Sequence, residues 1–577
     1  MANPDDEGFD DFVRGLLNTT VSSVCADIVS SDDEDILLHN MSNSEDEDPP
    51  GSTQQFSADG WNNVTNVDPG PQTIPIYNVN EGPVLPVLFD GDYLPIDYFS
   101  LFFNEDILSF ICNETNLFAE KRKSNVTSPH ARVNKWNALS PIELKAFLGV
   151  IINMGIKPLP NLESYFTKKW VDRIPFFSDV FSKNEFLNIF WNLHFNHDSD
   201  GVGNVRPKGF LIQPLLEHMK TMCQMFYTPS NNVAIDESTI SFKGRVSFRV
   251  YNPMKPTKFG LKIFVLSDCV NGYMYNFIPY YGKEELIPNS KLLKTTQIVK
   301  VLTESVVFKS DAPTSGLHVF TDRYYTSPEV AKELLSINTY ITGTVMPNRV
   351  GMPPRLKTES KSLKKGQILS QRKSNVLVCS WKDKRVVHVL STFSKVSKNL
   401  VTECPSKWPN MPSTKKPDVV LNYTKHMGAV DRSDHFISSY QFMRRTRKWY
   451  RKMFFWLLEV AIVNSYILYR SVQINSGRKP LVHLDFRKSL VESLVAEKIA
   501  TRPTCKRGRP AQGPPEQRLN GSQHFMDKRE NGKRTRCVVC FKRGERKETV
   551  YFCKSCVTKP GLHPENCFEA YHTRMHL

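Results

Sequence analysis

The sequence predicts an α/β core framed by helices, with a metal-binding module at the C-terminal end and a disordered, acidic N-terminus. Three observations lead to this prediction. Short β-type runs alternate with helical runs between residues 231 and 345, and helical patterns lie on either side of them. Five of the 12 cysteines lie between Cys537 and Cys567. A chain of 577 residues has room for about three or four domains.

Charge is divided unevenly along the chain. Residues 1–50 contain 14 acidic side chains and a single basic one, Arg14, whereas the whole chain has a net charge of +16. The remainder is therefore strongly basic, which favours a polyanion such as DNA as the partner. Residues 1–87 are predicted to be disordered, because their acidic runs bury too little apolar surface. These residues are either a solubilising tail or the substrate of an acid-directed kinase. The second alternative rests on three serines that are followed by acidic residues: Ser30, Ser31 and Ser44.

Several classes of protein are disfavoured by the same composition. The most apolar stretch, from Phe454, is interrupted by Glu459 and Asn464, so no membrane span is expected. The N-terminus has neither the basic nor the apolar region of a secretory signal. The cysteines are too sparse for a disulfide scaffold and indicate metal binding in a reducing compartment.

The segment 88–230 is predicted to be mostly helical. One helix has Ser140 as N-cap, Pro141 at its first position and Glu143 as capping-box partner. A second helical pattern, NEFLNIFWNLHF, begins at Asn184.

Next come three strands, a helix, a strand, a helix and a strand, an α/β order of the ribonuclease H type. This segment, 231–345, is predicted to be the first part of the catalytic core. The predicted segments that follow are an insertion module at 346–415, a second part of the core at 416–440, a helical part at 441–500 with a long apolar helix from about Tyr450 to Val472, a basic linker at 501–535 and a cysteine-rich zinc domain at 536–577.

Three acidic residues stand at ends of these elements. Asp236 and Asp322 follow strand patterns, and Asp431 lies near the start of a helix. Acids at the ends of adjacent strands project from the same edge, and three converging carboxylates suit two Mg²⁺ ions that promote phosphodiester displacement. Three neighbouring acids remain alternatives that the spacing does not exclude: Glu237, Asp268 and Asp434.

Ordered sequence blocks around these acids resemble a known family. They are VAIDESTISFKGR, YNPMKPTKFGLKIFVLSD, VFTDRYYTSPEVAKELL, ITGTV, NYTKHMGAVDRSDHFISSY and RKWYRKMFFWLLEVAIVNSYILYR. Together with WNALSPIELKAFLGVIINMG upstream and RKETVYFCKSC near the end, they resemble the signature blocks of the piggyBac transposase family, in the same order. The resemblance spans roughly residues 88–577.

This resemblance implies a cut-and-paste DNA transposase with a ribonuclease H-like core and insertion at the tetranucleotide TTAA. It implies that Asp236, Asp322 and Asp431 are catalytic and hold two Mg²⁺ ions, with Mn²⁺ as an alternative, and that Asp434 assists them. The flanking helical parts would serve dimerisation and DNA binding, since two transposon ends must be brought together in a dimer or larger assembly in the nucleus. Two alternatives are a nuclear DNA-binding protein that derives from such an enzyme and no longer transposes, and a basic nuclear scaffold.

Basic segments near the acids are predicted to contact DNA. Trp449 lies among them and either stacks on an unpaired base or anchors the following helix. KRGRP, from Lys506, has the core of an AT-hook, with a nuclear-import signal or a plain linker as alternatives. The predicted contacts are Lys243, Arg245, Arg249, Lys255, Lys258, Arg444, Arg445, Arg447, Lys448, Trp449, Arg451, Lys452, Arg507 and Arg509.

The C-terminal Cys and His spacing offers eight ligands, the number that two tetrahedral Zn²⁺ ions need. An interleaved pairing is favoured, and it resembles the cysteine-rich domain by which family members bind transposon ends. His576 is not a dependable family position, so the eighth ligand is left open. The predicted groups are Cys537, Cys540, His563 and Cys567 for one ion, and Cys553, Cys556, His572 and His576 for the other.

Overall fold

A computed structural model of the chain divides after Ala500 into two compact units, which are described separately. The described residues are 60–64, 68, 70–71, 76–77, 79–86, 92–197, 206–253, 257–282, 287, 290–309, 314–354, 356–395, 401–404, 414–442, 446–501, 519 and 523–574.

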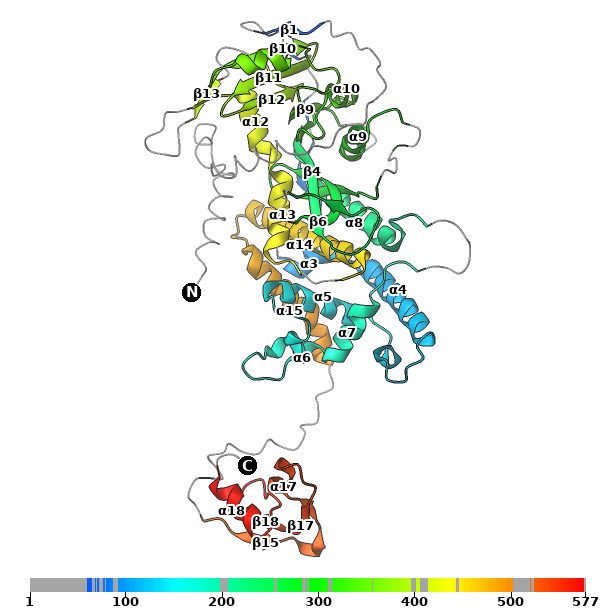
Figure 1. The fold of residues 1–577 in the computed structure, drawn as a ribbon, viewed down its shortest axis with the longest axis vertical. Helices are drawn as coiled ribbons and strands as arrows, with labels where there is room; N and C mark the ends of the chain where they lie inside the picture. Colours follow the sequence, from blue (N-terminus) through cyan, green and yellow to red (C-terminus); the bar gives the residue numbers. More distant parts are fainter. Residues whose placement is uncertain are drawn as a thin grey trace. The chain divides into compact units, whose positions relative to one another are not determined.

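A ten-stranded sheet organises the first unit (Figure 1). The strand order is β1-β10-β11-β12-β9-β8-β4-β6-β5, and β7 pairs with β6. The strands are β1 (Asn62–Asn63), β4 (Asn232–Ser241), β5 (Val250–Tyr251), β6 (Phe259–Asp268), β7 (Met274–Pro279), β8 (His318–Thr321), β9 (Tyr340–Thr344), β10 (Ile368–Lys373), β11 (Val376–Lys382) and β12 (Val386–Ser391).

The central strands follow the order that the sequence predicts. β4 is antiparallel to β6 and parallel to β8, and β8 is parallel to β9. Helix α9 (Lys294–Val307) precedes β8, and α10 (Pro328–Ser336) connects β8 to β9. Because β4 lies in the middle of the sheet, its side chains can meet residues from both the parallel and the antiparallel neighbours.

Much of the predicted insertion module, 346–415, continues the central sheet. Strands β10, β11 and β12 continue the same sheet from β9, and only β13 (Val401–Cys404) and β14 (Thr414–Pro417) form a small sheet of their own. The β-type runs VLVCSW and VVHVLSTF of this segment correspond to β11 and β12.

The predicted disorder of residues 1–87 is wrong for part of that range. Asn62 and Asn63 form β1, which pairs antiparallel with β10, and β2 (Gly82–Pro83) pairs with β3 (Tyr227–Thr228). Residues 1–59 lie outside the described part of the chain. The kinase-site serines Ser30, Ser31 and Ser44 fall in that range.

Helices dominate the segment before β4, as predicted. They are α3 (Pro95–Ser100), α4 (Glu105–Ser124), α5 (Pro141–Ile156), α6 (Pro175–Val180), α7 (Lys183–Asn192) and α8 (Gln213–Met225). The predicted start of α5 is confirmed: Ser140 is the N-cap, Glu143 completes a capping box and Pro141 is at the first position.

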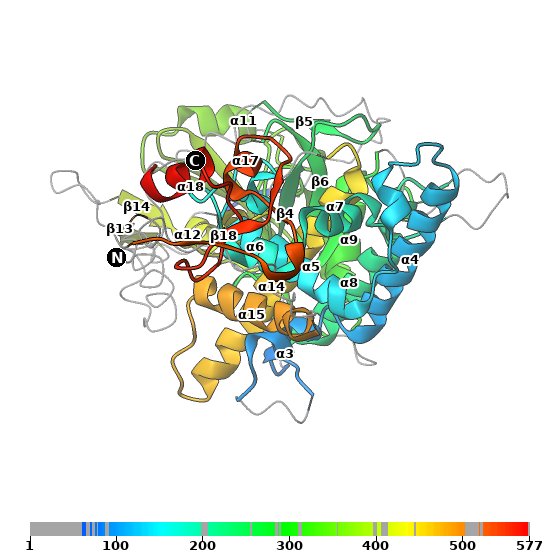
Figure 2. The ribbon, with the colours of Figure 1, turned by 90° about the horizontal axis from the view of Figure 1, so that it is seen from below.

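The long apolar helix α14 (Trp449–Asn475) runs through the interior of this unit and contacts α3, α8 and the sheet (Figures 1 and 2). By length and composition it could cross a membrane, but its most apolar window is completely buried within the fold. Its buried Glu459 accepts a 2.6 Å hydrogen bond from Arg487 of α15 (His483–Thr501). The charge of Glu459 therefore has a partner inside the protein.

The second unit is a small module with two strand pairs. β15 (Met526–Lys528) pairs with β18 (Tyr551–Cys553), and β16 (Thr535–Arg536) pairs with β17 (Glu548–Thr549). Helices α17 (Val538–Lys542) and α18 (Asn566–Thr573) complete it. Since β15 belongs to this module, the predicted linker, 501–535, extends too far toward the C-terminus.

Candidate active site, basic cavity and zinc centres

One face of the central sheet is covered by α12 (Asp418–Met427) and α13 (Ala429–Ser439). Ala234 of β4 and Phe320 of β8 pack there against Met427 and Ala429 in a small buried apolar cluster. This cluster fixes the two helices over the strand pair β4 and β8. It also determines where the polar residues just beyond it are placed.

The three predicted catalytic aspartates each lie two residues beyond a member of this cluster. Asp236 lies in the middle of β4 and not at its end as predicted, and because side chains alternate along a strand it projects from the same face as Ala234. Ile235 pairs with Thr321 in the parallel register, which puts Asp236 beside Asp322 in the sheet. Asp431 is in the first turn of α13, two residues after Ala429. The fold thus brings all three predicted residues to one region.

The half-buried Tyr423 of α12 lies close to all three aspartates. Burial raises the pKa of its hydroxyl, and the charges of Asp322, Asp236 and Asp431 raise it further because all three carboxylates lie around it. Tyr423 shares a 3.3 Å hydrogen bond with the Thr344 hydroxyl of β9. The three aspartates are not among the described groups whose ligand atoms all lie within 4.8 Å of one another.

The surroundings of Asp322 disfavour a negative charge that no cation compensates. Burial raises the pKa of Asp322 to about 6, with the Glu237 carboxylate adding to the rise and the backbone N–H groups of Tyr324 and Tyr325 opposing it. Asp236, Asp322 and Asp434 are half-buried and Asp431 is exposed. Accessible, crowded carboxylates of this kind fit a hard divalent cation, which takes oxygen ligands and offsets their repulsion.

The three alternative acids have different surroundings. Asp434 accepts a 2.6 Å hydrogen bond from the Ser238 hydroxyl, on the same face of β4 as Asp236. Glu237 points to the opposite face, where Lys262 donates to it at 2.6 Å. Asp434 therefore stays near the predicted triad. Glu237 is held in an ion pair with Lys262, but its charge still acts on Asp322, whose pKa it raises.

Asp268, at the end of β6, has a structural role. Its carboxylate is completely buried and accepts hydrogen bonds from the Ser230 backbone N–H at 2.6 Å, the Tyr227 hydroxyl at 3.1 Å and the Val270 N–H at 2.7 Å. These donors hold together the turns around β4 and β6. Its burial leaves no access for a substrate.

A cavity of about 1500 Å³ brings the two predicted basic segments together. Lys243 and Arg245 follow β4 on one side, and residues at the start of α14 line the other side. Arg122 of α4 and Trp191 of α7 also line it, and sequence analysis identified neither. The cations from the α14 side are Arg447, Lys448, Arg451 and Lys452.

The predicted contacts in this segment differ in accessibility. Arg447 and Lys448 are exposed, whereas Arg451 is 1% exposed and donates to the Trp191 carbonyl at 2.6 Å. Lys452 is buried in the cavity wall, and burial lowers its pKa to about 8. Arg451 thus has a structural bond that sequence analysis did not foresee.

Trp449 is half-buried and packs edge-on against Phe248, with ring centroids 5.2 Å apart, and against Tyr281. These contacts favour the helix-anchor alternative. Lys258 is exposed, and Arg249 donates to the carbonyls of Lys243 and Gly244. The predicted contacts that lie outside the described residues are Lys255, Arg444, Arg445, Arg507 and Arg509.

The first predicted zinc group is assembled in the second unit. The ligand atoms of Cys537, Cys540, His563 and Cys567 all lie within 4.8 Å of one another. Cys540 Sγ is 3.6 Å from Cys567 Sγ and 3.5 Å from His563 Nδ1. A tetrahedral zinc site, given its bond lengths, has S to S edges of about 3.8 Å and S to N edges of about 3.6 Å. The donor set and its spacing fit zinc.

The pKa values of two thiols in this group are also shifted by their surroundings. Burial raises the pKa of Cys537, but backbone N–H donors from Cys540, His563 and Val539 outweigh it and lower the value to about 7. Burial, together with Cys567 and Cys537, raises the pKa of Cys540 to about 12. Zinc would favour the thiolate form of both cysteines.

The second zinc group differs from the prediction in one ligand. Cys553, Cys556 and His572 come together with His524, whose Nδ1 is 3.8 Å from Cys553 Sγ and 3.7 Å from Cys556 Sγ. His524 precedes β15, in the stretch that the sequence analysis took for linker. His576, the predicted fourth ligand, lies outside the described residues.

Comparison with known proteins agrees with this arrangement. A family model described as Transposase IS4 matches residues 94–466, and one described as a DDE_Tnp_1-like zinc finger matches residues 519–573. The human PiggyBac transposable element-derived protein 3 is 25% identical over 485 residues, which cover 83% of this chain and 76% of that protein. This chain belongs to the piggyBac transposase family.

Two further relatives support the family assignment. The human PiggyBac transposable element-derived protein 2 is 24% identical over 452 residues, covering 77% of this chain and 72% of that protein. A cryo-EM structure of a piggyBac transposase synaptic complex with hairpin DNA is similar with a TM-score of 0.62 and 26% identity, covering 74% of this chain and 86% of that one. The mixed α/β core is therefore the fold of a piggyBac transposase.

Proposed function

We propose that this protein is a metal-dependent DNA transposase that excises an element and inserts it at TTAA, with a ribonuclease H-like core. One observation carries the proposal. Asp236, Asp322 and Asp431, from two parallel strands and one helix, all lie just beyond the apolar cluster that fixes α12 and α13 to the sheet. A purely structural role does not explain why three carboxylates share one accessible region.

The residues of this region would have different roles. Asp236, Asp322 and Asp431 would hold two Mg²⁺ ions, or Mn²⁺ in their place, and Asp434 would keep α13 aligned with β4 through Ser238. When bound, such ions polarise the scissile phosphate and stabilise the attacking and leaving oxygens. Tyr423, held by Thr344, would limit the space between the carboxylates.

Other parts of the chain would hold DNA. The solved relative is a synaptic complex with hairpin DNA, which supports DNA binding and an assembly of at least two copies. The cations of the cavity at the end of β4 are suited to phosphate. The two zinc groups would shape the second unit for recognition of transposon ends, and the basic KRGRP segment would serve nuclear import or minor-groove contact.

The test is to incubate the zinc-loaded protein with Mg²⁺ and DNA that carries candidate element ends beside TTAA. Strand cleavage that Asp322→Ala lacks supports the proposal. A wild-type protein that cleaves no more than Asp322→Ala would defeat it.

An alternative function has one observation in its favour, because two similar human proteins are described as element-derived. Under this alternative the chain binds DNA in the nucleus without transposing. Retained specific binding without cleavage would be its signature in the same experiment.

A further inference from the structure

Trp191 occupies an unusual position for a tryptophan in this fold. It is the next-to-last residue of α7, its side chain is 41% exposed, and it lines the basic cavity. Phe190, next to it in the chain, is 1% exposed and packs edge-on against the indole with centroids 5.0 Å apart, and the Arg451 guanidinium lies 5.9 Å from the indole centroid. One side of the indole is thus supported by protein while much of its surface stays open.

The backbone at Trp191 is held rigidly by two guanidinium groups. Arg122 of α4 donates to the Trp191 carbonyl at 3.2 Å and to Asn192 Oδ1 at 2.5 Å. Arg451 of α14 donates to the same carbonyl at 2.6 Å and to the Leu193 carbonyl at 3.3 Å. These arginines satisfy the free carbonyls at the end of α7, so the indole projects from a fixed base made by three helices.

Trp449 is a poorer candidate for base stacking. It is wedged against Phe248 and Tyr281, and it is not among the residues that line the cavity. Of the two tryptophans, only Trp191 combines an open surface with the cavity.

We propose that the basic cavity is a binding site for an unpaired nucleotide of the DNA substrate, with Trp191 as the stacking platform for the base. The cations around it, including Arg122, Lys243 and Lys448, would neutralise the flanking phosphates. An exposed indole offers a sequence-tolerant face for any base. A cavity of about 1500 Å³ has room for an extruded base together with its sugar and phosphates.

The distance between the basic cavity and the proposed catalytic region is one that a single strand of DNA can span. Ser241, at the end of β4, lines the cavity. It is five residues beyond Asp236, a separation of about 17 Å along an extended strand. A strand of DNA that enters the catalytic region could therefore place a base a few nucleotides away into the cavity. This inference rests on the proposed function only in naming DNA as the ligand.

The experiment compares the affinity of full-length, zinc-loaded protein for two probes, without added Mg²⁺ so that cleavage does not interfere. One probe is a plain duplex oligonucleotide, and the other is the same duplex with a short run of unpaired thymines. We expect the wild type to prefer the unpaired probe about tenfold, the scale of stacking one base on an aromatic ring. Trp191→Ala should lose this preference while it binds the duplex as before, and Trp191→Phe should keep most of it.

A matched control is available in Trp170, which is 89% exposed and lies in the turn closed by the Asp172 N–H and the Lys169 carbonyl, away from the cavity lining. Trp170→Ala should leave the preference intact. The inference is overturned if the wild type shows no preference, if Trp191→Ala keeps it, or if Trp170→Ala removes it equally. Since the assay needs no catalysis, absence of cleavage would reject the proposed function without changing this result.

Discussion

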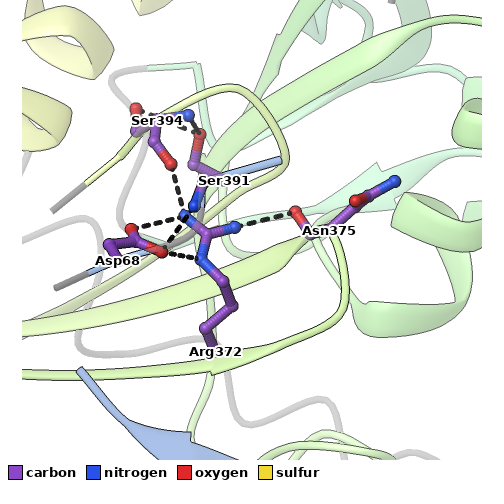
Figure 3. Close-up of polar contacts among 6 residues, drawn as sticks. Asp68, Arg372, Asn375, Ser391 and Ser394 are labelled. Atoms are coloured by element: carbon purple, nitrogen blue, oxygen red, sulfur yellow. Dashed lines mark hydrogen bonds and ion pairs between the residues drawn. The ribbon is translucent and has the colours of Figure 1, made fainter. Parts of the chain in front are cut away.

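Arg372 of β10 donates from Nε and Nη2 to the two carboxylate oxygens of Asp68, at 2.5 and 2.8 Å, and both side chains are almost fully buried (Figure 3). Arg372 also donates to the carbonyls of Asn375 and Ser394. Asp68 belongs to the segment that the sequence predicts to be disordered. This bidentate pair, together with β1, instead attaches that segment to the edge of the sheet.

Asp68→Ala should destabilise the protein strongly. It leaves the Arg372 guanidinium buried without its carboxylate, which typically costs about 3–5 kcal/mol. Asp92→Ala is the matched control, because Asp92 pairs with Arg478 at the surface with side chains 81% and 49% exposed, and such pairs contribute about 1 kcal/mol or less. Urea unfolding of both variants checks this. Equal midpoints for Asp68→Ala and the wild type would contradict the structural role of the pair.

The position of Asp68 also determines how the acidic tail must be tested. Deleting residues 1–59 removes the acidic runs but keeps β1 and Asp68, and it should strengthen non-specific DNA binding at low salt if the tail competes for the basic surface. Deleting residues 1–85 should lower stability as well. DNA affinities at two salt concentrations measure the effect, and an unchanged affinity after the shorter deletion would leave the tail as a solubiliser.

Lys452 should make DNA affinity depend on pH. Burial lowers the pKa of Lys452 to about 8, and a DNA phosphate nearby would raise this pKa again. Above pH 8, where the side chain of the free protein is mostly neutral, Lys452 must therefore take up a proton when DNA binds. Affinity should therefore be flat below pH 8 and fall as the pH rises above it. The neighbouring Lys448, whose pKa is lowered by burial and by Arg451 and Arg122, contributes in the same direction.

Lys452→Arg keeps its charge throughout this range. DNA affinity of this variant should therefore fall less steeply between pH 7.5 and 9 than that of the wild type. Because one proton is involved, the slopes should differ by at most about tenfold in affinity per pH unit. Fluorescence anisotropy with a labelled duplex at constant ionic strength measures the two slopes. Identical slopes for Lys452→Arg and the wild type would exclude Lys452 from the DNA-binding surface.

The eighth zinc ligand can be decided by two substitutions in the full chain. His524→Ala should lower the zinc content from about two ions to about one, because His524 Nδ1 faces both Cys553 and Cys556. His576→Ala should leave both ions bound. Metal analysis after dialysis gives the count, and the opposite pattern would restore the ligand set expected from sequence.

Some features could be predicted because they depend on local patterns. The capping box at Ser140, the order of strands and helices between β4 and β9, all four ligands of the first zinc group and three of the second depend on short-range patterns in the sequence. Each rests on hydrogen-bond, burial or ligand requirements that act over a few residues.

The features that were missed depend on contacts between distant segments. Arg122 meets Trp191 across 69 positions, and Arg372 meets Asp68 across 304. His524 stands in polar, Gly-containing sequence that gave no sign of a strand nearby. Only the folded chain shows that such side chains share a site, since nothing in the local sequence marks their partners.

The central claim, that three aspartates form one catalytic region, is tested most directly by the cleavage rates of single variants at fixed zinc and Mg²⁺. Asp236→Asn, Asp322→Asn and Asp431→Asn should each lower the rate on the order of a thousandfold while DNA binding persists, because each removes a metal ligand worth several kcal/mol in the transition state. Asp172→Asn, an exposed control, should cleave normally. A wild-type rate in any one of the three variants would contradict the shared catalytic role.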